Sequence, residues 1–218
     1  MTDIMPNFAG LLTGVLALGL LSFVAVTMTS FIKISVVLFL LRNALGIQQT
    51  PPNMVLYCIA LLLSSYIMAP VIKAAYEAAL SSGQPINGVA DYVAVAGRAQ
   101  GPVKDFLLHF TDEAERQFFA NATKRVWGPE AHMDASADDM MIVVPSFVLS
   151  ELRRSFEIGF LIYLPFIAID LVITAVLMAM GMSAVSPTTI SVPFKLFLFV
   201  ATEGWTRLIH GIILGYAR

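Results

Sequence analysis

The chain has 218 residues, of which 58% are hydrophobic and 13% are charged, and its formal net charge at pH 7 is −2. Soluble domains average roughly 45–50% apolar and about 25% charged residues, so this composition indicates a membrane-associated protein. The charge balance argues against a nucleic-acid partner, and the single cysteine, Cys58, excludes a disulfide within the chain.

Four apolar stretches approach or exceed the roughly 20 residues that cross the core of a bilayer. They cover residues 8–41, 54–72, 158–182 and 190–214. The start of the chain lacks the basic region of a secretory signal, so we expect the first stretch to be retained as a membrane helix.

The stretch between these apolar pairs is more polar and carries most of the charges. Apolar residues recur every three or four positions from Val103 to Ala122, which predicts one amphipathic helix over 103–127 between loops at 81–88 and 128–139. We therefore divide the chain into N-terminal apolar helices (1–72), a helical middle region (73–157) and a C-terminal apolar hairpin (158–218).

Candidate catalytic and metal-binding residues are few. Ser30 and Lys33 have the spacing of a serine–lysine nucleophile pair, but no accompanying motif is present, and a lysine that extends to the membrane surface explains Lys33 better. His132 lies among acidic residues that match no metal-ligand spacing. We expect no enzymatic activity, no metal and no cofactor.

Three ionisable residues, Asp170, Lys195 and Glu203, lie inside the last two apolar stretches. Such residues face protein or a water-filled path, because each costs about 2.5–3.5 kcal/mol at the centre of a bilayer. In a hairpin folded about Val185, Asp170 matches Glu203 in depth but not Lys195, so the partners should come from other segments or other subunits. A proton or cation site in a small-solute transporter is the alternative.

The hairpin turn reads "MAMGMSAVSP", residues 178–187. Methionine is flexible and polarisable, so it fills irregular gaps and repacks readily. These methionines are either ordinary apolar contacts or part of a seal that can open.

Two long stretches resemble the signatures of the SctR/FliP family. They are "SFIKISVVLFLLRNALGIQQTPPNMVL" and "SELRRSFEIGFLIYLPFIAIDLVITAVLMAMGMSAVSPTTISVPFKLFLFVATEGW". The resemblance implies an all-α subunit of a helical pore assembly, the export gate of type III secretion in the bacterial inner membrane, within the basal body. The apparent lack of a cleavable signal favours the virulence or symbiosis branch, SctR (YscR/HrcR-like), over the flagellar one.

The resemblance also implies partners. Family members form a pentamer with SctS and SctT, work beside SctU and SctV, contact membrane lipid, and pass unfolded effector and needle subunits.

The same resemblance assigns the site. Flagellar members carry three successive methionines that line the pore, and the matching positions here are Met182, Ser183 and Ala184. We therefore expect a constriction within the loop 180–187, formed by Met180, Gly181, Met182, Ser183, Ala184 and Val185. The charges expected at subunit contacts are Arg42, Glu151, Asp170, Lys195 and Glu203, and Arg42 should bind a carboxylate or backbone carbonyls.

Overall fold

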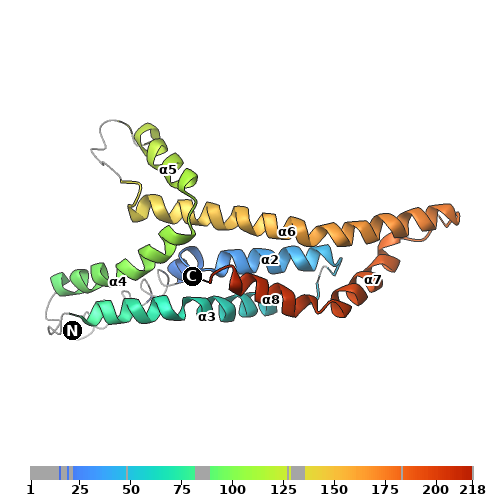
Figure 1. Ribbon diagram of the computed structural model, residues 1–218, viewed down its shortest axis with the longest axis horizontal. Coiled ribbons are helices and arrows are strands. Elements are labelled where there is room, and N and C mark those ends of the chain that lie inside the picture. The colour runs from blue at the N-terminus through green and yellow to red at the C-terminus, as the bar shows by residue number, and fades with distance from the viewer. Residues whose placement is uncertain are drawn as a thin grey trace, which may run out of the picture. The chain divides into compact units, whose positions relative to one another are not determined.

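The described part of the chain consists of helices and the turns between them, which confirms the all-α class. The computed structural model describes residues 15, 19, 22–47, 49–81, 89–126, 128, 136–182 and 184–217. The helices, labelled in Figure 1, are α2 (Phe31–Ala44), α3 (Asn53–Leu80), α4 (Val89–Phe110), α5 (Glu113–Val126), α6 (Met140–Ala179), α7 (Pro187–Ala201) and α8 (Gly204–Leu214).

Within the described residues, two helices, α3 and α6, are long and apolar enough to cross a membrane. The pair α7 and α8 would add a third if its two members form one broken span, because they meet at a bend of 61°. The described residues therefore account for two or three spans, and most of residues 8–21, in the first of the four predicted spans, lie outside them.

The first predicted span, 8–41, is interrupted. Residues 22–27 are helical, residues 28–30 form a bend, and α2 then begins at Phe31. Threonine hydroxyls explain the break: Thr29 Oγ1 bonds the carbonyl of Ala25 at 2.5 Å and accepts the N–H of Phe31 at 3.2 Å. Such bonds compete with the helical backbone pattern. Most of residues 8–21 lie outside the described residues.

The chain divides into two compact units, and both predicted boundaries, at 72/73 and 157/158, fall inside the continuous helices α3 and α6. The first unit comprises Met1–Ile32 and Met68–Ser150, and the second comprises Lys33–Ile67 and Glu151–Arg218. α6 has 40 residues, about 60 Å at 1.5 Å per residue, which is twice the thickness of a bilayer core.

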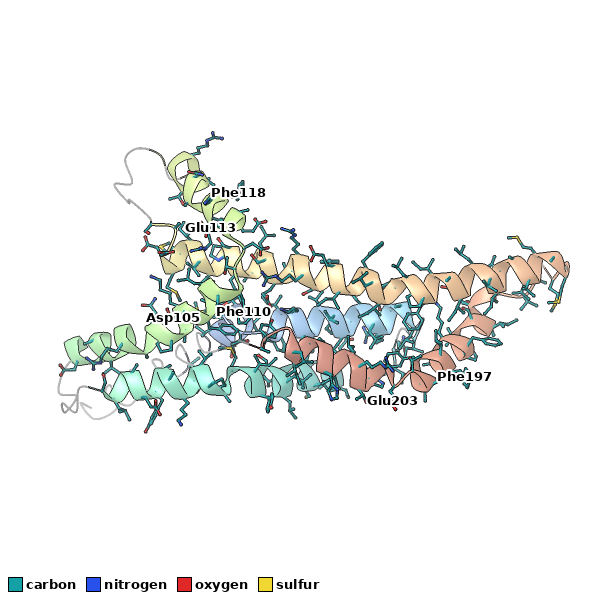
Figure 2. The ribbon with its side chains drawn as sticks, viewed as in Figure 1. Asp105, Phe110, Glu113, Phe118, Phe197 and Glu203 are labelled. Atoms are coloured by element: carbon teal, nitrogen blue, oxygen red, sulfur yellow. The ribbon has the colours of Figure 1, made fainter. Side chains whose placement is uncertain are left out.

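In the first unit, the predicted single helix over 103–127 is wrong, because α4 ends at Phe110 and α5 begins at Glu113. The backbone N–H of Asp112, in the break, donates to Ser150 Oγ on α6 at 3.0 Å. Phe106 and Phe110 are buried on α4, whereas Phe118 on α5 is exposed, so the apolar stripe does not continue through the break (Figure 2). The predicted loop at 82–88, and His132, lie outside the described residues.

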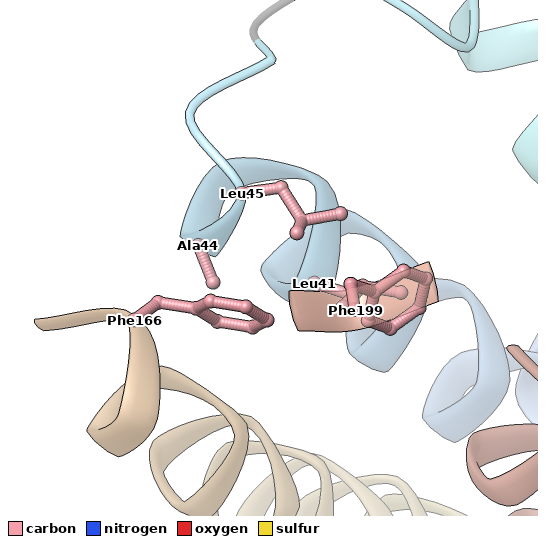
Figure 3. Close-up of a cluster of buried hydrophobic side chains, with 5 residues drawn as sticks. All are labelled: Leu41, Ala44, Leu45, Phe166 and Phe199. Atoms are coloured by element: carbon pink, nitrogen blue, oxygen red, sulfur yellow. The ribbon is translucent and has the colours of Figure 1, made fainter. Parts of the chain in front are cut away.

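In the second unit, α2, α6 and α7 meet in an apolar core. Figure 3 shows its buried side chains, which are Leu41, Ala44, Leu45, Phe166 and Phe199. Close approach of α2 to α6 depends on Gly159, where an added Cβ would lie 2.2 Å from Leu40 Cδ1. Ala44 in this core also accepts a hydrogen bond from Lys195, one of the charged residues considered next.

Candidate functional site

The loop between α6 and α7 begins with a Schellman motif centred on Gly181. Gly181 has a φ of 70°, its N–H bonds the carbonyl of Met178 at 3.0 Å, and the N–H of Met182 bonds the carbonyl of Leu177 at 3.0 Å. This pattern satisfies the last carbonyls of a helix and requires a left-handed residue, which glycine adopts readily. The sequence Met-Gly-Met therefore ends α6 sharply, and Pro187 starts α7 at a position where proline is favoured.

The methionines of this loop are exposed. Met178, Met180 and Met182 all present large hydrophobic side chains on the surface of the second unit, and Ala184 is also exposed. Ser183 lies outside the described residues. The loop therefore offers soft apolar side chains at the far end of a helical hairpin, a surface that water disfavours.

An open apolar cavity of about 670 Å³ lies between α6 and α7, beside the loop. Its lining includes Met180 and carries no polar surface. The other lining residues are Ala168, Ile169, Val172, Ile173, Val176, Leu177, Ile190, Phe194, Phe197 and Leu198. Together with the loop, it makes the outer half of the hairpin a continuous apolar surface.

Lys195 and Asp170 form an ion pair within the hairpin, which corrects the expectation that the hairpin does not pair its own charges. Lys195 Nζ lies 2.6 Å from Asp170 Oδ2 and 3.1 Å from the carbonyl oxygen of Ala44, at the end of α2. The expectation placed the fold of the hairpin at Val185. α6 ends at Ala179 and α7 begins at Pro187, so Asp170 lies nine residues before the end of α6 and Lys195 eight residues after the start of α7, at matching depth.

This pairing bears on the transporter alternative. A cation or proton site needs a carboxylate that is free to exchange its partner, and the buried ammonium of Lys195 already neutralises Asp170. The ion pair instead joins α2, α6 and α7.

A second charged cluster is buried around Glu151, near the start of the second unit's part of α6. Glu151 is fully buried, and its Oε1 accepts from Lys33 Nζ at 3.2 Å and from Arg154 Nη1 at 3.4 Å. Its Oε2 accepts from the hydroxyl of Tyr216, two residues beyond α8. Lys33 Nζ also lies 3.8 Å from the centre of the Tyr216 ring, a cation–π contact.

This cluster corrects the view of Lys33 as a lysine at the membrane surface, because its side chain is buried and ion-paired. The pairing also commits the Lys33 ammonium to Glu151, which is not the partner that a serine–lysine pair would use. Among the described residues, no group of three His, Cys, Asp or Glu side chains could hold a metal ion.

Tyr216 is a residue that the sequence did not single out. Burial, and then the neighbouring Glu151 carboxylate, raises the pKa of the Tyr216 hydroxyl well above its usual range, so the hydroxyl stays protonated and donates. The available signal was Lys33 itself, since a lysine in an apolar run needs a counter-charge. That signal does not identify a tyrosine 183 positions away, and only the folded chain brings Tyr216 to Glu151 and Lys33.

Glu203 occupies the bend between α7 and α8 (Figure 2). It has φ 53° and ψ 41°, the left-handed conformation, and is the only such non-glycine residue in the described part of the chain. At the next residue, Gly204, an added Cβ would lie 2.2 Å from the ring of Phe199.

Arg42 closes the turn between α2 and α3. Its Nη1 donates to the carbonyl oxygen of Pro51 at 3.2 Å and to Asn53 Oδ1 at 2.6 Å, and its guanidinium lies 5.1 Å from the centre of the Phe39 ring. The predicted bond to a backbone carbonyl is present. Both bonds come from one nitrogen, so the planar fork is not used in a bidentate way.

Comparison with known proteins identifies related chains. Residues 14–212 match the FliP family. The chain is 51% identical to the probable translocation protein y4yL of Sinorhizobium fredii, over 99% of this chain and 97% of that protein. It is 46% identical to Yop proteins translocation protein R of Yersinia pestis, covering 97% and 98% of the two chains. It is 44% identical to the hypersensitivity response secretion protein HrcR of Ralstonia nicotianae, covering 96% and 98%.

Proposed function

The chain belongs to the FliP family, and on that premise we propose that it is a membrane subunit of a bacterial type III secretion apparatus. The names of its relatives refer to translocation of Yop proteins and to secretion in the hypersensitivity response, and these proteins match the chain over nearly its whole length. The two apolar helices α3 and α6 are suited to the inner membrane.

More finely, the proposal makes the chain a pore subunit of the export gate, with no catalytic step. Five copies, together with SctS and SctT, form a passage for unfolded secretion substrates inside the basal body, beside SctU and SctV. In a membrane protein the apolar surface of the hairpin is covered either by lipid or by other subunits, and the proposal assigns it to contacts between subunits.

One observation carries this proposal: three exposed methionines, one in the last turn of α6 and two in the sharply capped loop that follows it. Methionine side chains from several copies can close a passage against ions and still rearrange around a polypeptide, because each has three rotatable bonds and no polar group to satisfy. Only Met182 remains of the three flagellar positions, so the seal depends mainly on that side chain.

The test is ion leak through the assembled gate. Met182→Ala should raise the conductance of gates reconstituted in planar bilayers, and deletion of residues 182–184 should raise it further. Met141→Ala is the matched control, since Met141 is an exposed methionine in the first turn of α6, at the opposite end from the loop. An unchanged conductance in the deletion variant, with the complex intact, would show that the loop is not the seal.

A further inference from the structure

We propose that α7 and α8 form a two-state limb, bent or straight, and that contact of Tyr216 with Glu151 and Lys33 is the latch that holds the bent state. The proposal concerns the conformation of a single chain, so it does not depend on the proposed function.

The bend is unfavourable for the residues that form it. Glu203 carries a Cβ but adopts the left-handed conformation, which the neighbouring carbonyl disfavours for L-residues. A non-glycine residue persists in such a conformation when the surrounding structure holds it there. The sequence therefore places a strained residue at the junction of two helices.

The next residue makes the bend possible. The ring of Phe199 packs where a side chain of residue 204 would lie, so only glycine fits in the bent state. If Glu203 returned to the right-handed conformation, residues 187–214 would form one helix. α7 and α8 together are apolar enough for that helix to cross a membrane as a single span. Bent and straight limbs are thus both compatible with the composition.

Two contacts, one on each side of the bend, hold this limb on α6. Lys195 ties α7 to Asp170, and Tyr216, beyond α8, contacts Glu151. Asp170 and Glu151 are 19 positions apart on α6, which is about 28 Å at 1.5 Å per residue.

The length of the limb matches these anchors when it is bent. A straight helix would separate residues 195 and 216 by about 32 Å, whereas a 61° bend reduces the separation to about 28 Å. The bend therefore brings the limb close to the spacing of its two anchors, so release of Tyr216 should relieve Glu203 and let the limb extend. Because α7 begins directly after the loop 180–187, this extension would move the loop relative to α8.

The experiment is a distance measurement by pulsed electron spin resonance. Spin labels are placed on cysteines at the exposed positions Thr189 and Leu214, in a Cys58→Ser background, and labelled chains are diluted with unlabelled ones so that only distances within one chain contribute. Helix geometry predicts about 32 Å between these positions with the 61° bend and about 38 Å without it.

Tyr216→Ala removes the whole latch and should shift the distribution toward about 38 Å, the straight-helix value. Tyr216→Phe keeps the ring over Lys33 and loses only the hydroxyl, so a smaller shift is expected. His210→Ala, on an exposed position of α8, is the control and should leave the short distance unchanged.

A second change distinguishes a released latch from general unfolding. Glu203→Gly removes the conformational penalty of the bend, so adding it to Tyr216→Ala should restore the short distance. A single short distance in Tyr216→Ala, or no restoration by Glu203→Gly, would overturn the proposal.

Discussion

Loss of Asp170 should damage the chain more than loss of its partner, Lys195. The two side chains are buried to different extents: the Lys195 side chain is 7% exposed, whereas the Asp170 side chain is 40% exposed. In Asp170→Ala the buried ammonium of Lys195 loses its carboxylate partner. Of its two hydrogen bonds, only the one to the carbonyl of Ala44 remains. Lys195→Met leaves a carboxylate that water can reach.

The magnitudes follow from this difference. Breaking a buried pair so that one charge stays uncompensated costs about 3–5 kcal/mol, which is the expected loss for Asp170→Ala. Lys195→Met loses a charged hydrogen bond worth about 1.5–3 kcal/mol, and hydration of the freed Asp170 offsets part of that loss. The double variant Asp170→Ala, Lys195→Met leaves no uncompensated charge, so it should be more stable than Asp170→Ala alone.

Thermal unfolding of the purified chain in detergent tests this order. The midpoints should fall from wild type to Lys195→Met to Asp170→Ala, with the double variant above Asp170→Ala. If Asp170→Ala unfolds at or above the temperature of Lys195→Met, the ammonium of Lys195 is not buried as described, and the reasoning fails.

Two further changes test other contacts. Arg42→Lys keeps the charge and one nitrogen that can donate to both acceptors, but it loses the planar guanidinium over the Phe39 ring, so it should cost about 1 kcal/mol in denaturant unfolding. A loss as large as that of Arg42→Ala would contradict the arrangement through Nη1. Gly159→Ala should lower the free energy of unfolding by about 1–3 kcal/mol, because its new methyl group overlaps Leu40. Adding Leu40→Ala should recover part of that loss, and no recovery would show that α2 and α6 do not approach at this point.

The helical class could be predicted from composition and apolar runs, but the lengths of the helices could not. The charges from Glu151 to Glu157 suggested a domain boundary near residue 157. The structure instead has one helix, α6, that begins at Met140 and passes through this point. Arg153 and Glu157 pair along the exposed side of the helix at 3.1 Å, and Glu151 is neutralised inside the second unit. Charges therefore interrupt an apolar pattern without interrupting a helix.

The candidate site was predicted in part. The positions of Gly181 and Pro187 were sufficient to locate the turn, because both residues have strong positional preferences at helix ends. The ion pair of Lys195 with Asp170 was missed because the hairpin was folded about Val185, whereas its turn is centred on residue 183. Moving the centre by two residues changes the residue opposite any given position by four. The contacts of Glu151 with Lys33 and Tyr216 involve residues 118 and 65 positions away, and no local pattern encodes such separations.

The contact between Lys33 and Glu151 also sets an interval of time during synthesis. At about 5–20 residues per second, the 118 residues that separate them take about 6–24 s to translate. Until Glu151 is synthesised, this ion pair cannot form, and the ammonium of Lys33 lies in an apolar segment without its folded-state partner. The time for which Lys33 lacks Glu151 therefore depends on the speed at which the ribosome crosses the middle region.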